Sequence, residues 1–369
     1  MTSGSDGSNS NLRVALSMLT LVPGGMGGSE TYAGELTRQL ALTSDVSATA
    51  FIPESARGFG HGLPEHIVSG LREGDSTLDR LSAVTGITLR AAELRRAMAT
   101  ADVVHYPFTV PAPKPGKKQA SVQSLLDVQH LELPQLFSKA ELLYRRQFYE
   151  GFAKRADAVI TFSHFAKERM VELLEIDAER IYVAHLGVDT ARFTPNLGER
   201  ENFLLYPARG WTHKNHRTLI ASVEIARRVN PNLRLVLTGG ALDALGEVPD
   251  WVDRRGLVSE DELLELYRTA GALVFPSLYE GFGLPPLEAM ASGCPVAVSD
   301  AGSLPEVVGD AAVLFDAKQP EAIAQGIAEA LRRAPELSAA GVRHVGRFTW
   351  ESCLDVHLAA YAAASEARH

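Results

Sequence analysis

Cysteine is scarce in this chain, because only Cys294 and Cys353 occur among its 369 residues. The two lie far apart and form no CxxC pair. A disulfide framework or a cysteine-based zinc site needs more cysteines at closer spacing. The sequence therefore argues against both, and we expect the two thiols to be buried as small apolar side chains.

Long apolar runs are missing as well. No uninterrupted hydrophobic stretch approaches the ~20 residues that a transmembrane helix requires, so we predict that the chain does not cross a bilayer. Residues 1–11, MTSGSDGSNSN, have neither a cationic start nor an apolar segment. This pattern predicts a disordered tail and no secretory signal, and hence a cytoplasmic protein.

The chain also lacks an excess of basic residues. The chain has 36 Lys and Arg against 45 Asp and Glu, a formal net charge of −9. Nucleic acid is therefore not an expected partner, since phosphate binding needs clustered cations. The segments 111–118 and 145–155 are locally basic and could contact an anionic acceptor or a membrane surface. A proline-rich loop and a solvated helix face are the simpler interpretation.

Short apolar runs alternate with helical patterns along the chain, which is typical of βαβ units and parallel sheets. The expected strands of the first half are Leu12–Leu19, Ser47–Pro53, Ala101–Pro107, Gln119–Leu126, Ala156–Ser163 and Arg180–Leu186. Those of the second half are Phe203–Arg209, Leu233–Gly240, Arg254–Ser259, Gly271–Ser277, Cys294–Asp300 and Ala311–Asp316. The sequence thus predicts an α/β fold of two Rossmann-like, doubly wound parallel-sheet domains that face a cleft.

A turn-rich stretch, 187–202, interrupts this alternation and marks the expected domain boundary. We predict a first domain over 12–190 and a second domain over 191–347, with the tail 1–11 outside both. The alanine-rich helical pattern 348–369 is expected to cross back and pack on the first domain.

Glycines dominate the loop that follows the first expected strand, in VPGGMGGSE. Glycine lets the backbone approach a ligand closely, and the helix that follows offers free N–H groups to an anion. Gly24, Gly25, Gly27 and Gly28 are therefore candidate diphosphate contacts, with an ordinary tight turn as the alternative. The spacing matches neither GxGxxG nor GxxxxGK[ST], so the NAD and ATP-hydrolysis interpretations lose support.

Two further strand ends carry polar side chains. Asp127, Gln129 and His130 follow the strand Gln119–Leu126, where they could bind sugar hydroxyls or orient an acceptor. Arg209 and Lys214 follow the strand Phe203–Arg209, and a bidentate guanidinium with a mobile ammonium suits a departing diphosphate. His105 ends another strand, and a structural role is equally plausible for it.

The stretch FPSLYEGFGLPPLEAMASGCP places Glu280 in a loop and Glu288 about one turn into a helix that Pro285 and Pro286 begin. Two nearby acids suggest a general acid and base, as in glycoside hydrolases. The loop-and-helix context instead predicts two separate binding tasks. A loop acid and a solvated helix residue are the alternative.

Five motifs together resemble the retaining glycosyltransferases of family 4, which have the GT-B fold. They occur in the expected order over nearly the whole chain, from about Arg13 to Tyr361, and the fourth is highly specific. The motifs are GGMGGSE, AHLGVDTARF, PARGWTHKNH, FPSLYEGFGLPPLEAMASGCPVAVSD and SLPEVVGDAAVLFD.

The resemblance implies transfer of a hexosyl group from a nucleotide-sugar to a hydroxyl acceptor, with retention of anomeric configuration. By this similarity Arg209 and Lys214 hold the diphosphate, Glu288 binds the ribose, and Gly27 and Gly28 complete the phosphate cradle. The donor sugar is assigned to Glu280 and the backbone of Gly281, Phe282, Gly283 and Leu284. No DxD motif is present, and the Arg/Lys pair stands where other families use a divalent cation, so no metal or other cofactor is expected.

One departure from the family concerns the active site. Many relatives have His-Asp where this chain has Leu126-Asp127, and that histidine contacts the donor sugar. We therefore expect Asp127 and His130 at the active site, with His130 taking over part of the histidine's role.

The donor and acceptor stay open at this stage. The motifs most resemble bacterial mannosyl- and rhamnosyl-type transferases of polysaccharide, glycolipid or natural-product synthesis, so GDP-mannose is the first choice before UDP-glucose and dTDP-rhamnose. The acceptor, which is lipid-linked in some such pathways, is expected to be selected by the loops 51–80 and 108–118. The rival functions are a nucleotide-sugar epimerase, a phosphorylase, or a nucleotide-sugar-binding subunit with weak catalysis.

Overall fold

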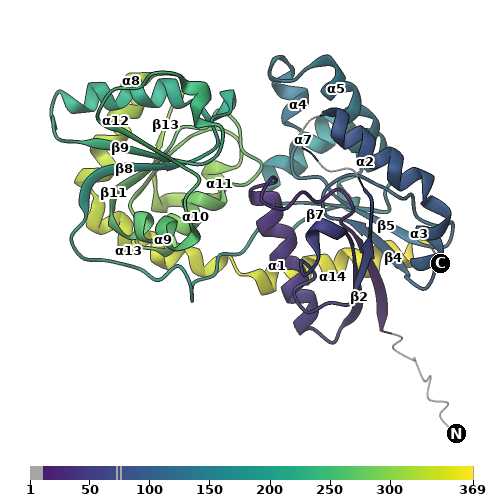
Figure 1. Ribbon diagram of the computed structural model, residues 1–369. Coiled ribbons are helices and arrows are strands. Elements are labelled where there is room, and N and C mark those ends of the chain that lie inside the picture. Colours follow the sequence, from purple (N-terminus) through teal and green to yellow (C-terminus); the bar gives the residue numbers. More distant parts are fainter. Residues whose placement is uncertain (1–10, 72–73, 75–76, 369) are drawn as a thin grey trace, which may run out of the picture.

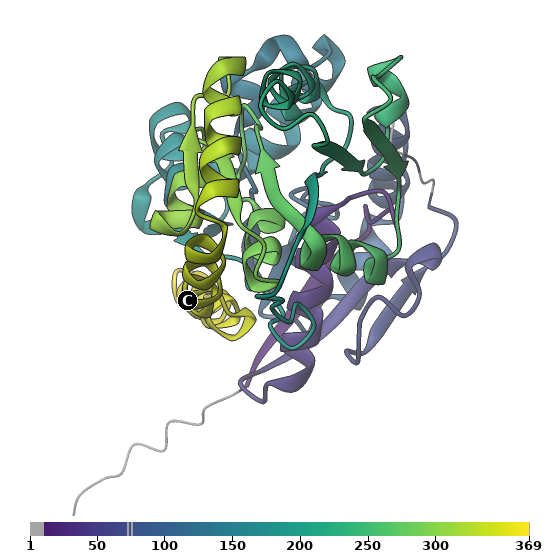
Figure 2. The same cartoon turned by 90° about the vertical axis from the view of Figure 1, so that its left-hand side faces the viewer.

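The computed structural model describes residues 11–71, 74 and 77–368, and it contains two α/β domains side by side (Figure 1). Each domain is built on one parallel sheet with helices on both faces, which confirms the predicted fold class. Seen from the side of the second domain, the first domain lies behind it (Figure 2). Of the predicted tail, only Asn11 lies within the described residues.

The first sheet has seven strands in the order β3-β2-β1-β4-β5-β6-β7, and every neighbouring pair is parallel. Its strands are β1 Leu12–Ser17, β2 Val46–Pro53, β3 Glu65–Val68, β4 Val103–Tyr106, β5 Ala120–Ser124, β6 Ala158–Thr161 and β7 Ile181–Val183. The sequence missed β3, which lies in the stretch 51–80 that we expected to be loop. Three of its four residues (EHIV) are only half-buried, and the sequence does not form the apolar run of a central strand.

The second sheet has six strands in the order β10-β9-β8-β11-β12-β13, again all parallel. Its strands are β8 Glu201–Pro207, β9 Arg234–Thr238, β10 Val252–Gly256, β11 Ala270–Phe275, β12 Val296–Ser299 and β13 Val313–Phe315. In both sheets the order reverses direction beside the first strand, at β1/β4 and at β8/β11. Ligands of doubly wound sheets bind outside the carboxyl ends of the strands at such a point.

Helices cover both faces of each sheet. Those of the first domain are α1 Gly28–Leu42, α2 Thr77–Leu89, α3 Ala91–Ala97, α4 Gln129–Glu132, α5 Lys139–Arg145, α6 Gly151–Ala153 and α7 His164–Leu174, with one π-helical turn over Arg146–Glu150. Those that follow are α8 His216–Arg227, α9 Glu260–Thr269, α10 Leu284–Ala291, α11 Leu304–Val308, α12 Pro320–Arg332, α13 Ala334–His344 and α14 Trp350–Glu366. None of these helices is both long and apolar enough to span a membrane.

The strands are apolar on both faces because both faces are covered. Along β1, Val14 and Leu16 belong to one hydrophobic cluster and Ala15 to the other, as the two-residue period of a strand requires. The two cysteines, Cys294 and Cys353, are buried free thiols, which confirms the sequence prediction.

Two chain segments connect the domains. The first runs over 184–200 between β7 and β8, close to the predicted boundary, and the second leads from α13 into α14. Helix α14 lies against β4 to β7 and α1, so it belongs to the first domain by its packing.

Buried hydrogen bonds hold α14 to this sheet. Tyr361 Oη lies 2.8 Å from His105 Nδ1, and His357 Nε2 lies 2.8 Å from Tyr32 Oη. Ser124 Oγ joins both halves of the network, at 2.8 Å from His105 Nε2 and 2.7 Å from Tyr32 Oη. His105 is therefore a structural residue, and burial places its pKa well below the ordinary value.

Candidate active site

A cleft of about 800 Å³ lies between the two domains and is formed by loops at the carboxyl ends of both sheets. The first domain contributes the loops after β1, β4 and β5 together with α5, and the second domain contributes the loops after β8 and β11. Among the residues that line it are Gly25, Met26, Ser29, Thr109, Asp127, Gln129, Arg145, Arg209, Trp211, His213, Lys214, Glu280 and Gly281. The doubly wound topology therefore brings together along the cleft five of the twelve residues that the family resemblance assigns to the site, namely Asp127, Arg209, Lys214, Glu280 and Gly281.

The glycine loop approaches the second domain closely. Gly24 and Gly27 have φ values of 74° and 57°, a region that favours glycine. The Arg209 guanidinium donates from Nη2 to the carbonyl of Gly24 over 3.4 Å, and a Cβ on Gly27 would lie 4.0 Å from its Nε. Gly27 thus lies beside Arg209, which is predicted to bind the diphosphate. The described loop residues that line the cleft include Gly25 and Met26, but not Gly27 or Gly28.

Part of this loop's hydrogen-bonding capacity is already used. The Glu30 carboxylate, in the first turn of α1, accepts from the backbone N–H of Gly24 at 2.8 Å and of Met26 at 3.3 Å. The Glu30 carboxylate therefore fixes the shape of the loop. The N-terminus of α1, which follows the loop, stays open to a ligand.

The two predicted cations come from the loop between β8 and α8. Lys214 Nζ lies 2.6 Å from Glu280 Oε1, and only 14% and 13% of these side chains are exposed. The guanidinium of Arg209 lies 5.4 Å from the ring of Trp211, so an aromatic face helps to hold it. Both cations face the cleft, as the sequence predicted.

Asp127 faces these cations from the first domain. Its Oδ1 accepts from the backbone N–H of Gln129 at 3.1 Å. Burial raises its pKa, and the nearby charge of Arg145 opposes this shift. A Cβ on Gly281 would lie 2.7 Å from the carbonyl of Leu126, so the loop that carries Glu280 packs directly on the Leu126-Asp127 backbone.

His130 does not occupy the place that the sequence analysis assigned to it. The ring is buried below the cleft, with Nε2 3.2 Å from Glu150 Oε1 and with Phe137 and Tyr149 packed edge-on against it. Burial and Arg145 lower its pKa to about 4. The helical turn that follows Asp127 directs Gln129 to the cleft and His130 into the core, so His130 does not line the cleft.

The loop 278–283, between β11 and α10, carries Glu280 and is called the donor loop below. Hydrogen bonds to its carbonyl groups hold its shape. Ser303 Oγ donates to the carbonyls of Glu280 at 3.0 Å and of Phe282 at 2.6 Å. Phe282 and Leu284 place buried side chains in the core, and Gly283, with φ 118°, begins α10. Of the five predicted residues from 280 to 284, Glu280 and Gly281 are those that line the cleft.

Glu288 lies apart from this group. Its carboxylate, on α10, accepts a hydrogen bond from Tyr267 Oη of α9 at 2.9 Å, and it is not among the described residues that line the cleft. Burial raises its pKa to about 7, against the hydrogen bond from Tyr267 and the charge of Arg192. Glu280 and Glu288 thus lie in different places, one in a cleft loop and the other buried on α10, while the two binding tasks, including the ribose contact, stay predictions.

The raised pKa of Glu288 predicts a pH-dependent stability. The folded protein keeps this proton between about pH 4.5 and 7, where the unfolded chain has lost it. The contribution of Glu288 to the free energy of unfolding should therefore fall by ~3 kcal/mol as the pH rises through this window. Urea unfolding of the wild type and Glu288→Gln at both ends of the window measures it, since other titrating groups are common to both. Parallel pH profiles of the two proteins would contradict the assignment.

Arg145 is the main cleft residue that the sequence analysis left without a role. Its guanidinium lies over the rings of Phe137 at 4.5 Å and Tyr149 at 5.1 Å, and Nη2 donates to Glu141 at 3.2 Å. The basic character of the segment 145–155 was the only signal. His213 was missed as well, and burial with the charge of Lys214 lowers its pKa to about 4, so it lines the cleft as a neutral ring at neutral pH.

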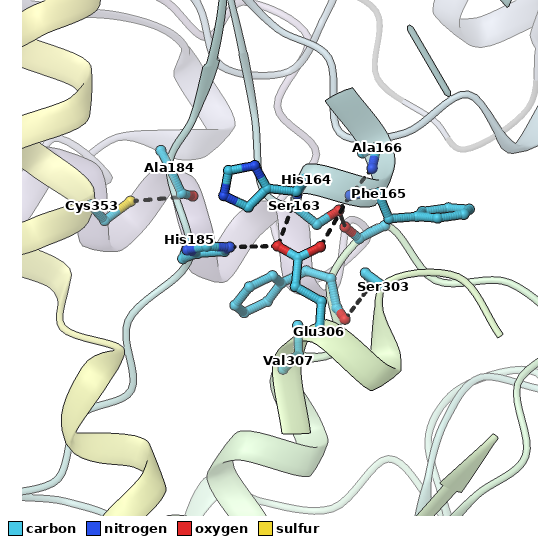
Figure 3. Close-up of polar contacts among 12 residues, drawn as sticks. Ser163, His164, Phe165, Ala166, Ala184, His185, Ser303, Glu306, Val307 and Cys353 are labelled. Atoms are coloured by element: carbon cyan, nitrogen blue, oxygen red, sulfur yellow. Dashed lines mark hydrogen bonds and ion pairs between the residues drawn. The ribbon is translucent and has the colours of Figure 1, made fainter. Parts of the chain in front are cut away.

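One group of three side chains in the described part of the chain has metal-ligand chemistry. Ligand atoms of His164, His185 and Glu306 lie within 4.8 Å of one another, at the domain boundary and outside the cleft (Figure 3). Both oxygens of Glu306 already accept hydrogen bonds, from the ring of His185 and from two backbone N–H groups. The group therefore forms an interdomain contact.

Two family models match the chain, one for each domain. The model described as "Glycosyltransferase Family 4" matches residues 26–192, and the one described as "Glycosyl transferases group 1" matches residues 188–341. Their matches meet at the linker and together span both sheets. The chain belongs to the family 4 glycosyltransferases.

This family 4 glycosyltransferase resembles relatives with different substrates in their names. It is 28% identical to the O-antigen chain mannosyltransferase B of Escherichia coli, over 67% of this chain and 71% of that protein. It is 27% identical to a D-inositol 3-phosphate glycosyltransferase of Stackebrandtia nassauensis, over 94% of this chain and 88% of that protein. It matches about half the length of the O-antigen chain mannosyltransferase RfbU of Salmonella typhimurium, at 34% identity over 46% of this chain.

Solved structures, glycosyltransferases among them, share the two-domain fold. HepE from Anabaena, in complex with UDP-glucose, superimposes with a TM-score of 0.70 at 16% identity, over 95% of this chain and 98% of that one. The likeness establishes the GT-B architecture of this glycosyltransferase, in which two domains meet at a cleft.

Proposed function

We propose that this protein is a metal-independent, retaining hexosyltransferase that moves a sugar from a nucleotide-sugar to a hydroxyl acceptor in glycan, glycolipid or natural-product synthesis. The observation that carries the proposal is the cleft in which Arg209 and the Lys214–Glu280 pair face Asp127 across the domain boundary. Two cations at the strand ends of one domain and a carboxylate at those of the other suit a diphosphate and a sugar that lie between them.

The cations act on the leaving group. As the bond between the anomeric carbon and the diphosphate breaks, negative charge develops on the phosphate oxygen. Arg209 and Lys214, with the N-terminus of α1, are placed to stabilise this charge. In this mechanism the acceptor oxygen attacks from the same face, and its proton passes to the departing phosphate oxygen.

The carboxylates position the reactants in this mechanism. Glu280 is held beside Lys214 and binds the donor sugar, and Asp127, across the cleft, orients the sugar or the acceptor hydroxyl. Holding two reactants in one geometry is a large part of the rate enhancement of a transferase, and closure of the cleft excludes water from competing.

GDP-mannose is the proposed donor. Two of the relatives described above are named as O-antigen mannosyltransferases, which supports both a mannosyl donor and a role in polysaccharide synthesis. Other donors must also be tested, because one relative is named as a D-inositol 3-phosphate glycosyltransferase and the HepE structure is a complex with UDP-glucose.

A thermal-shift panel of GDP, UDP, dTDP and ADP sugars tests the donor. A ligand that binds the native state alone raises the apparent stability with ln(1 + [L]/Kd), so GDP-mannose should give the largest shift. Product analysis with labelled donor then tests the reaction, and sugar transfer with retained configuration is the expected result. An epimerised sugar, or binding without any turnover, would overturn the proposed function.

A further inference from the structure

The N-terminus of α7 joins the first domain to the donor loop of the second. Glu306, on α11 of the second domain, accepts from the backbone N–H of His164 at 2.8 Å and from that of Phe165 at 3.0 Å (Figure 3). These are the first two residues of α7, whose N–H groups have no partner within the helix. A carboxylate of the second domain thus caps the N-terminus of a helix of the first domain.

The linker contributes to the same contact. His185, two residues after β7, places Nε2 2.7 Å from Glu306 Oε1, and its ring lies against those of His164, Phe282 and Phe348. Partial burial acts to raise the pKa of Glu306, but the hydrogen bonds from His185, His164 and Phe165 outweigh it, so the pKa is lowered. Glu306 is therefore a carboxylate at neutral pH, as a favourable interaction with the positive end of α7 requires.

Ser163 extends the contact to the donor loop itself. As the N-cap of α7, its Oγ accepts from the backbone N–H of Ala166 at 3.1 Å, and the same hydroxyl donates to the carbonyl of Gly281 over 2.8 Å. Ser163 is fully buried. One side chain of the first domain thus both caps its own helix and holds the residue next to Glu280.

Three consecutive carbonyls of the donor loop are consequently fixed. Ser303, in the turn that leads to Glu306, holds the carbonyls of Glu280 and Phe282, and Ser163 holds that of Gly281 between them. Ser303 and Glu306 are three residues apart at one end of α11, so the contact of Glu306 with α7 also places the Ser303 hydroxyl. The position of Glu280 is therefore set jointly by both domains.

We propose that Ser163 and Glu306 are positioning residues of the transfer reaction, which hold the Glu280 loop in register with Asp127. The inference rests on the proposed function, because it assigns Glu280 to the donor sugar. Neither residue lines the cleft among the described residues, and both lie apart from the loop that carries Arg209 and Lys214. Their loss should disturb the alignment of the reacting groups and leave the nucleotide contacts in place.

The first test is a comparison of kcat with nucleotide affinity. Ser163→Ala and Glu306→Ala should each lower kcat by about tenfold to a hundredfold, since small displacements of reacting groups have effects of this size. The Kd for the nucleoside diphosphate should change less than about twofold, and Ser163→Thr, which keeps the hydroxyl, should restore most of kcat. Unchanged kcat in folded Ser163→Ala and Glu306→Ala would overturn the inference.

Ser259→Ala is a matched control. Ser259 caps α9 in the same way, by accepting from the backbone N–H of Glu262 at 3.1 Å, but it is exposed and lies within the second domain. Its loss should lower the melting temperature like that of Ser163 and leave kcat unchanged. Equal kcat losses in both cap variants would show a general effect of stability and would also overturn the inference.

Hydrogen exchange separates this inference from the proposed function. In Glu306→Ala the amides of 163–166 and of 279–283 should exchange faster together, and in Ser259→Ala they should not. This readout needs no turnover. A wild-type protein without transfer activity would therefore refute the proposed function, whereas unchanged exchange of 279–283 in Glu306→Ala would refute the coupling of the two domains.

Discussion

Joint replacement of Arg209 and Lys214 by alanine is expected to lower kcat/KM by about a thousandfold or more while the fold is retained. A single preorganised donor to a developing charge contributes about a hundredfold to a thousandfold, and this pair supplies two cations to the same diphosphate. Both lie in a loop between β8 and α8 and face the cleft, so their removal leaves the core intact. Steady-state kinetics with labelled donor, together with circular dichroism, would measure the effect.

The control for this pair is Arg217→Ala. Arg217 is an exposed residue of α8, one turn beyond Lys214, and its loss should leave kcat/KM within about twofold of the wild type, as surface substitutions usually do. Near-normal turnover of the Arg209/Lys214 variant would remove the basis for a metal-independent reaction, because no other described pair of cations lies in the cleft loops of the second domain.

Glu280→Gln should lower kcat by about a hundredfold without weakening the binding of the nucleoside diphosphate. The substitution removes the ion pair that Glu280 makes with Lys214 at 2.6 Å, and it also removes a charged acceptor for the donor sugar. A free Lys214 keeps its attraction to the diphosphate, so the Kd for GDP should stay constant or fall. Such a fall in kcat without a rise in Kd is the pattern expected for an interaction that acts in the transition state.

Glu288→Gln provides the contrast. If Glu288 binds the ribose, its substitution should raise the Kd for nucleotide-sugar about tenfold and leave kcat at saturating donor nearly unchanged. Calorimetric titration and initial rates on both variants decide between the two roles. The same effect of both substitutions on kcat would favour a joint acid and base function, as in a glycoside hydrolase, over the separate binding tasks.

The sequence by itself determined the fold class, the number of domains and most of the cleft. Parallel strands that are covered on both faces must be apolar at nearly every position, so their runs are visible without any tertiary information. Loops that follow such strands meet at one edge of the sheet. For this reason Asp127, Arg209, Lys214 and Glu280 could be placed at strand ends from the sequence, and the family resemblance then assigned them to one site. The structure places all four along the cleft.

The tertiary structure decided what lies beside these residues. Gln129, in the cleft, and His130, in the core, are consecutive residues that point in directions about 100° apart around the helix. Only packing against Phe137 and Tyr149 shows which of the two points inward. Glu288 likewise gains its raised pKa from burial beside Tyr267, a neighbour on another helix. The direction in which a side chain points from a short helix, and the desolvation of a buried carboxyl group, depend on the assembled core. Local sequence patterns do not predict either of them.

The interdomain contact is the clearest case of this limit. Glu306 and His164 are 142 positions apart, and Ser163 and Gly281 are 118 positions apart, yet their hydrogen bonds connect the donor loop to the opposite domain. In the sequence, Glu306 is one acid of the motif SLPEVVGDAAVLFD, and Ser163 is the last residue of an expected strand. Which carbonyl or N–H group each one meets depends on how two complete domains pack together, and that arrangement exists only in the folded chain.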